Sequence, residues 1–113
     1  MKPLTIDEMQ SLQLELHSAY ADDWDSLNPS QAIPSLLWAL GEAGEMIDIL
    51  KKQGADNVIC DPKIHNHFSE EACDLLMYLM DTLLCLKVTP EEIAESFRAK
   101  QKRNLHRWKK ESE

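Results

Sequence analysis

Apolar residues recur along most of the chain at steps of three and four, the period of amphipathic helices. Four stretches show this pattern, and segments rich in Asp, Asn, Gly and Pro separate them. The predicted helices cover about residues 5–21, 30–53, 62–86 and 90–110. Gly is rare and aromatic residues make up 6% of the chain, which disfavours a β-sandwich or barrel. We therefore expect an all-α fold, a four-helix bundle that forms one domain over residues 1–113.

Local signals mark several helix ends. Thr5 and Glu8 have the spacing of a capping box, in which both side chains accept hydrogen bonds from backbone N–H groups of the first turn. Thr89 and Glu92 repeat this spacing before the last helix. The segment GADNVICDPK begins at Gly54, which is placed to end the second helix, and we predict a loop there.

Two predicted helices carry acids away from their apolar stripes. The predicted core stripe of helix 30–53 consists of Leu36, Leu40, Ala43, Ile47 and Leu50. That of helix 62–86 consists of Leu76, Leu79, Met80 and Leu83. Glu42 and Glu45 lie on a second side of the former helix, which also holds Trp38. Glu71 and Asp74 lie on a second side of the latter, in the sector of Tyr78, Asp81 and Cys85.

These four acids have no basic neighbours within their helices. Neither Lys nor Arg occurs between residues 36 and 50 or between residues 69 and 86. If the two helices pack antiparallel, the acid pairs converge, and carboxylates held together in a partly apolar site repel unless they are neutralised. Mg²⁺, or alternatively Mn²⁺, prefers oxygen ligands and would neutralise them. Ordinary acids on an exposed helix face are the simpler alternative.

The net charge and the composition exclude several classes of binding partner and site. The chain has 20 Asp and Glu against 12 Lys and Arg, a formal net charge of −8, which argues against binding polymeric nucleic acid. The three cysteines lack the spacing of a zinc site or a disulfide framework. No apolar stretch has the length of a membrane span or of a signal segment, so we expect no membrane association and a cytoplasmic location.

The acids and their surroundings resemble a known family. Glu42-Ala-Gly-Glu45, 25 further residues and Glu71-Ala-Cys-Asp74 are similar to the ExxE…ExxD pattern of the MazG-like nucleotide pyrophosphohydrolases. The flanking segments LLWALGEAGEMIDILKK and SEEACDLLMYLMDTL resemble the metal-binding helices of that family, and the similarity spans about residues 14–108. The resemblance implies an enzyme that uses Mg²⁺, held by these four acids, to hydrolyse a nucleoside triphosphate to the monophosphate and pyrophosphate. It also implies a homodimer or homotetramer and a role in nucleotide-pool house-cleaning.

Other residues become candidates through this resemblance. Members of the family tend to have a basic, Asn-containing stretch after the third helix. The segment AKQKRNLHRW is its counterpart here, and it offers Lys100, Asn104 and Arg107 as phosphate-binding residues. Glu70, or one of the ligand glutamates, is a candidate base for the attacking water. Trp38 either stacks on the nucleobase or packs in the core.

Two other classes of function fit parts of the pattern. A non-catalytic or redox helical metal protein would also gather carboxylates, but di-iron bundles usually supply ExxH pairs, and both pairs here end in an acid. A protein-interaction domain would use the acids to bind a basic partner, which leaves the apolar residues beside them unexplained. Incubation with Mg²⁺ and a nucleotide panel separates the three.

Overall fold

The computed structural model describes the backbone of residues 1–112 and the side chains of residues 1–107. The α-helices are α1 (Ile6–Ala19), α2 (Ala32–Gln53), α3 (Ala55–Cys60), α4 (Pro62–Cys85) and α5 (Pro90–Ser112), and a short 3₁₀ helix, η1 (Pro29–Gln31), leads into α2. Residues 1–112 contain no strand, so the expected all-α fold is confirmed. Within the same residues, no helix is long and apolar enough to cross a membrane.

The predicted capping residues form the ends of the long helices. Thr5 and Glu8 exchange the two hydrogen bonds of a capping box at α1, at 2.9 and 3.1 Å. Thr89 and Glu92 make the same pair before α5, at 3.2 and 3.1 Å. Gly54 ends α2 with a φ of 82°, a conformation that glycine adopts without the steric cost of a Cβ. The predicted bounds of the four long helices therefore agree with the structure to within about two residues.

A fifth helix lies where we predict a loop. α3 has only 6 residues and packs on both α2 and α4, with Val58 buried. Asp61 follows it and caps α4, because its side chain accepts hydrogen bonds from the backbone N–H groups of Lys63 and Ile64 at 2.9 and 3.3 Å. So short a helix cannot display an apolar period, and its Asp and Asn residues suggest a turn. The prediction of four helices was wrong for this reason.

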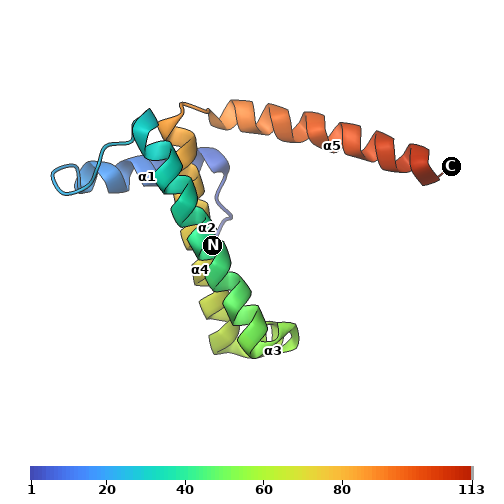
Figure 1. Ribbon diagram of the computed structural model, residues 1–113. Helices are drawn as coiled ribbons and strands as arrows, with labels where there is room; N and C mark the ends of the chain where they lie inside the picture. The colour runs from blue at the N-terminus through green and yellow to red at the C-terminus, as the bar shows by residue number, and fades with distance from the viewer. Residues whose placement is uncertain (113) are drawn as a thin grey trace.

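α2 and α4 lie side by side as an antiparallel pair that α3 joins (Figure 1). On each helix the less exposed residues follow steps of three and four, as in the seam of a coiled coil. On α2 they are Ala32, Ser35, Ala39, Glu42, Met46 and Ile49. On α4 they are Ile64, Phe68, Glu71, Leu75, Tyr78, Thr82 and Cys85. The seam thus contains a glutamate from each helix among mostly apolar or small residues.

The predicted core stripe of α2 is exposed within the single chain. Leu36 is 47% exposed, Leu40 64% and Ile47 52%. The prediction was wrong because α2 packs on α4 through the side that carries Ser35, Ala39 and Glu42. Small residues on that side let the two helix backbones approach closely. On this chain a row of large apolar side chains therefore faces outward.

The remaining long helices cover the α2–α4 pair only at one end. Among the described residues, α1 packs on α4, whereas α5 contacts α1 and neither α2 nor α4. Figure 1 shows α5 projecting away from the rest of the molecule. The predicted four-helix bundle is therefore not completed within one chain. The predicted stripe of α4 is partly right, since Met80 is buried but Leu76 is 39% exposed.

Candidate functional site

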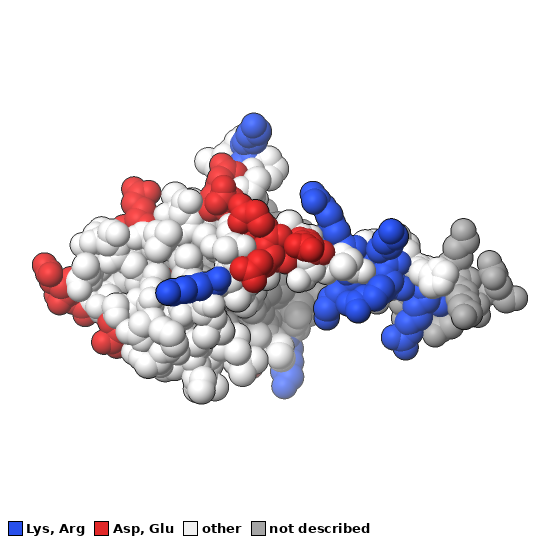
Figure 2. Space-filling model, turned by 90° about the horizontal axis from the view of Figure 1, so that it is seen from above, with Lys and Arg blue, Asp and Glu red and all other residues white. Residues whose placement is uncertain are grey.

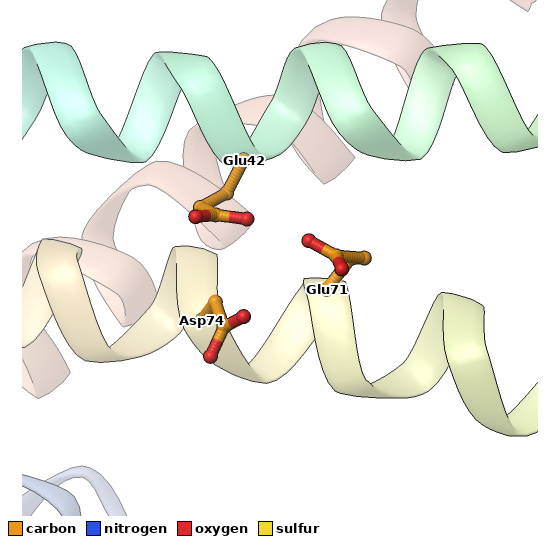
Figure 3. Close-up of side chains that lie close together, drawn as sticks. All are labelled: Glu42, Glu71 and Asp74. Atoms are coloured by element: carbon orange, nitrogen blue, oxygen red, sulfur yellow. The ribbon is translucent and has the colours of Figure 1, made fainter.

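Three of the predicted metal ligands meet between α2 and α4. Glu42 extends from α2 toward Glu71 and Asp74, which lie three residues apart on α4 (Figure 3). One carboxylate oxygen of each residue lies within 4.8 Å of the other two. The helix packing produces this convergence, because Glu42 and Glu71 both occupy seam positions, and Asp74 follows Glu71 by about one turn.

Crowding among these carboxylates changes the protonation of Glu42. A hydrogen bond with the Glu71 side chain raises the pKa of Glu42 to about 7, and partial burial and the charges of Glu71, Asp74 and Glu45 act in the same direction. The ring of His67 also lies close, with Nε2 3.4 Å from Glu71 Oε1. Near neutral pH the cluster therefore either keeps a proton on Glu42 or requires a cation in its place.

Two further acids predicted for the site lie outside this cluster. Glu45 is exposed and is not one of the three converging residues, although its charge reaches Glu42. Glu70 is also exposed, and its Oε1 accepts a hydrogen bond from Asn66 Nδ2 at 3.2 Å. The structure thus brings Glu42, Glu71 and Asp74 together and leaves Glu45 and Glu70 at the periphery.

A cleft of about 490 Å³ opens beside the cluster, within the size range of small-molecule sites. Glu42 and Asp74 line one end of it, and its walls come from α1, the segment between α1 and α2, α2 itself and α4. Neither Lys nor Arg lines the cleft, whereas Asp23, Asp25 and Asp81 add to its negative charge. An anionic ligand would therefore need cations that the described residues lining the cleft do not supply.

Aromatic side chains stand along the cleft next to the acids. Trp38 precedes Glu42 by about one turn of α2, Tyr78 follows Asp74 by about one turn of α4, and their ring centroids are 5.6 Å apart. Trp38 is 56% exposed, so it is not a core residue of this chain. Trp24 contributes a third ring and meets His17 edge to face at 5.1 Å. Flat apolar surfaces of this kind are suited to stacking on a nucleobase.

The predicted phosphate-binding residues lie far from the cleft of their own chain. Lys100, Asn104 and Arg107 are exposed on α5, and none of them lines the cleft. Figure 2 shows blue basic side chains gathered on the projecting helix, while red acidic ones lie over the body of the molecule. Because the described part of α5 contacts neither α2 nor α4, a single chain does not bring these residues to the carboxylates.

Sequence reasoning placed no function on a second polar group at the far end of the cleft. Asp81 of α4 and Gln13 of α1 are 7% and 5% exposed, and Gln13 Nε2 donates to Asp81 Oδ1 at 2.7 Å. His17 Nε2 lies 3.1 Å from the same oxygen. One signal was available, since Asp81 follows Asp74 by seven residues and so shares its helix face. The contact with α1 depends on tertiary packing.

The three converging carboxylates fit a hard divalent cation. Their oxygens are the ligand type that Mg²⁺ and Mn²⁺ prefer, and the hydrogen bond with Glu71, partial burial and the neighbouring negative charges all raise the pKa of Glu42. Comparison of the chain with family models, with curated protein sequences and with solved structures gave no match. The functional proposal therefore rests on the residues of this chain and their geometry.

Proposed function

We propose that the protein is a MazG-like nucleotide pyrophosphohydrolase, which hydrolyses a nucleoside or deoxynucleoside triphosphate to the monophosphate and pyrophosphate. The observation that carries the proposal is the convergence of Glu42, Glu71 and Asp74 at the end of an aromatic-lined cleft. The resemblance of their sequence surroundings to that family supports the same activity. House-cleaning of the nucleotide pool is the role proposed with it.

In this proposal the acidic side chains bind the metal ion and an aromatic side chain binds the nucleobase. Glu42, Glu71 and Asp74 would hold Mg²⁺ or Mn²⁺, and Glu45, whose charge acts on Glu42, is the fourth ligand that the family resemblance implies. The bound ion would neutralise charge on the phosphates and lower the pKa of a bound water. Trp38 would place the base beside the cluster by stacking.

The base that takes the proton from water is better sought within the cluster than at Glu70. Glu70 is exposed, accepts a hydrogen bond from Asn66 and does not line the cleft. Glu42 has a pKa raised to about 7, which suits proton transfer at neutral pH when its carboxylate is not fully engaged as a ligand. Glu45 is the second candidate, because it lies beside Glu42 on the exposed side.

A second copy of the chain would complete the site. The exposed α2 residues Ile33, Leu37 and Leu40, between 58% and 73% exposed, form an apolar surface that a homodimer or homotetramer would cover. The same association would bring the basic α5 of one chain toward the acidic body of its partner. Lys100, Asn104 and Arg107 would then contact phosphates in the partner's cleft, where they would supply the positive charge that the cleft lacks.

The activity is tested by incubating the protein with Mg²⁺ and a panel of nucleotides while pyrophosphate release is measured. We expect pyrophosphate and a nucleoside monophosphate from at least one triphosphate, and no product when the metal is chelated. Bound iron with a visible spectrum would instead favour the redox metal protein. Inertness toward every nucleotide, without bound iron, would favour the interaction domain.

The shared site has its own test. A D74N variant and a K100A/R107A double variant should each be inactive, but their mixture should regain part of the activity once subunits exchange. A stable monomer in sedimentation at micromolar concentration, or no recovery in the mixture, would contradict a site built from two chains.

A further inference from the structure

The cleft ends in a buried polar group opposite the carboxylate cluster. Asp81 is the acidic residue of this group, and Gln13 Nε2 supplies it with a hydrogen bond at 2.7 Å. His17 lies against the same carboxylate at 3.1 Å, yet both of its ring nitrogens are buried without a hydrogen bond to any described residue. A charged residue that is 7% exposed is costly unless its hydrogen-bonding capacity is used. The unused hydrogen-bonding capacity is that of the His17 ring, and both His17 and Asp81 line the cleft.

The polar group around Asp81 lies where the base of a nucleotide would reach if the phosphates were bound at the carboxylate cluster. Asp81 lies seven residues from Asp74 on the same face of α4, about 10 Å along the helix axis. The rings of Trp38 and Tyr78 line the cleft between these two acids. A nucleoside whose phosphates lie at the carboxylate cluster would stack on these rings and turn the edge of its base toward Asp81.

We propose that Asp81 selects the base of the nucleotide, and that the base it selects is guanine. This inference rests on the proposed nucleotide site and adds the substrate class. An ionised carboxylate only accepts hydrogen bonds, at about four lone-pair positions; Gln13 occupies one of them on Oδ1, and His17 Nε2 lies 3.1 Å from the same oxygen. Guanine alone among the common bases carries two adjacent N–H donors on its pairing edge, N1–H and the 2-amino group. Both can be donated to the two oxygens of one carboxylate.

The other common bases offer the Asp81 carboxylate fewer hydrogen-bond donors. Uracil and thymine place a carbonyl on each side of their single N–H, and a carbonyl oxygen that faces a buried carboxylate is repelled. Adenine and cytosine place one amino group beside a ring nitrogen that can only accept. A site built to pair with donors rejects analogues that lack them, because its buried polar atoms then lose their partners. Asp81 would therefore reject bases whose pairing edge carries acceptors as well as favour guanine, whose edge carries two donors.

A purely structural role for Asp81 predicts different behaviour. If its carboxylate served only to hold Gln13, and thereby α1, against α4, replacing it would weaken all nucleotides to the same extent. A role in base selection predicts a change in the order of preference. The decisive measurement is therefore a ratio between bases and not an activity alone.

The test compares the full-length protein with D81N, using guanosine, inosine and xanthosine triphosphates as substrates in Mg²⁺. Inosine lacks the 2-amino donor, so the unaltered protein should prefer guanosine over inosine by roughly tenfold or more in kcat/KM. Asparagine presents one acceptor and one donor, which match the N1–H and 2-carbonyl of xanthine. D81N should therefore lose the guanosine preference and favour xanthosine over guanosine by roughly tenfold.

Controls separate this inference from the proposed activity. D56N, a matched change at an exposed residue of α3, should keep the original preference, and circular dichroism should show that D81N is folded. Binding of guanosine and inosine monophosphates, followed by tryptophan fluorescence without metal, requires no turnover. Selective guanosine binding without pyrophosphate release would overturn the proposed activity and keep the base selection. Turnover without guanosine preference, or an equal loss for all bases in D81N, would overturn the base selection.

Discussion

The cleft is acidic at both ends, and the two ends balance their negative charge in different ways. Asp81 is buried, but Gln13 donates a hydrogen bond to it from within the same chain. Glu42, Glu71 and Asp74 are less buried, but the residues nearest their charges are further acids, apart from His67. The first end is a polar contact that the fold itself stabilises. The second is held at the expense of stability, which is typical of residues kept for a function.

This difference predicts the largest effect on activity at the carboxylate cluster. D74N removes one of the three converging charges, and we expect it to lower pyrophosphate release by at least about a hundredfold, since changes outside the ligand shell alone cost ten- to a hundredfold. Helicity should be unchanged, because Asp74 is exposed and caps no helix. D56N is the matched control and should keep full activity. Normal turnover by D74N would remove Asp74 from the site.

At the other end, the main effect should be on stability. Q13L removes the donor to Asp81 and leaves a buried carboxylate without it. We expect the free energy of unfolding to fall by about 1–3 kcal/mol, the usual cost of an unsatisfied buried polar group. Chemical denaturation measures this change, and E15L, which likewise introduces Leu at an exposed position of α1, is a suitable control. An unchanged unfolding free energy would mean that solvent already satisfies Asp81.

The two ends also differ in how far the sequence predicted them. Glu42, Glu71 and Asp74 follow from helix periodicity and from the lack of Lys and Arg nearby, both of which are local properties. The pairing of Asp81 with Gln13 joins residues 68 positions apart, and only the packing of α1 on α4 defines it.

The exposed stripe of α2 shows a related limit of sequence reasoning. Leu40 and Ile47 have the spacing of a core stripe, and they do form an apolar surface. Periodicity identifies such a surface without saying whether the same chain or another copy covers it. Here the small residues Ala32, Ser35 and Ala39 decided which side of α2 packs on α4.

Metal binding at the carboxylate cluster should depend on pH with a defined sign. Because the pKa of Glu42 is raised to about 7, below that pH a cation must displace its proton. The affinity for Mg²⁺ should rise by up to about tenfold per pH unit below 7 and level off above it. Calorimetry in buffers of different ionisation enthalpy should detect about one proton released at pH 6 and few at pH 8. A constant affinity between pH 5.5 and 7 would show that Glu42 does not bind the ion.

The smallest effect expected is a gain in stability from E42Q without metal. In the folded protein Glu42 keeps its proton up to a pH of about 7, whereas in the unfolded chain it loses the proton near its ordinary value of 4.5. The raised pKa therefore favours folding below 4.5, and this advantage is lost as the pH rises to 7. Glutamine cannot ionise, so the melting temperature of E42Q should exceed that of the unaltered protein by a margin that grows from about pH 5 to pH 7 and then levels off. Adding Mg²⁺ should raise the melting temperature of the unaltered protein more than that of E42Q. If E42Q were instead less stable at pH 8 without metal, the carboxylates would be balanced by the protein itself, and the contrast between the two ends of the cleft would be lost.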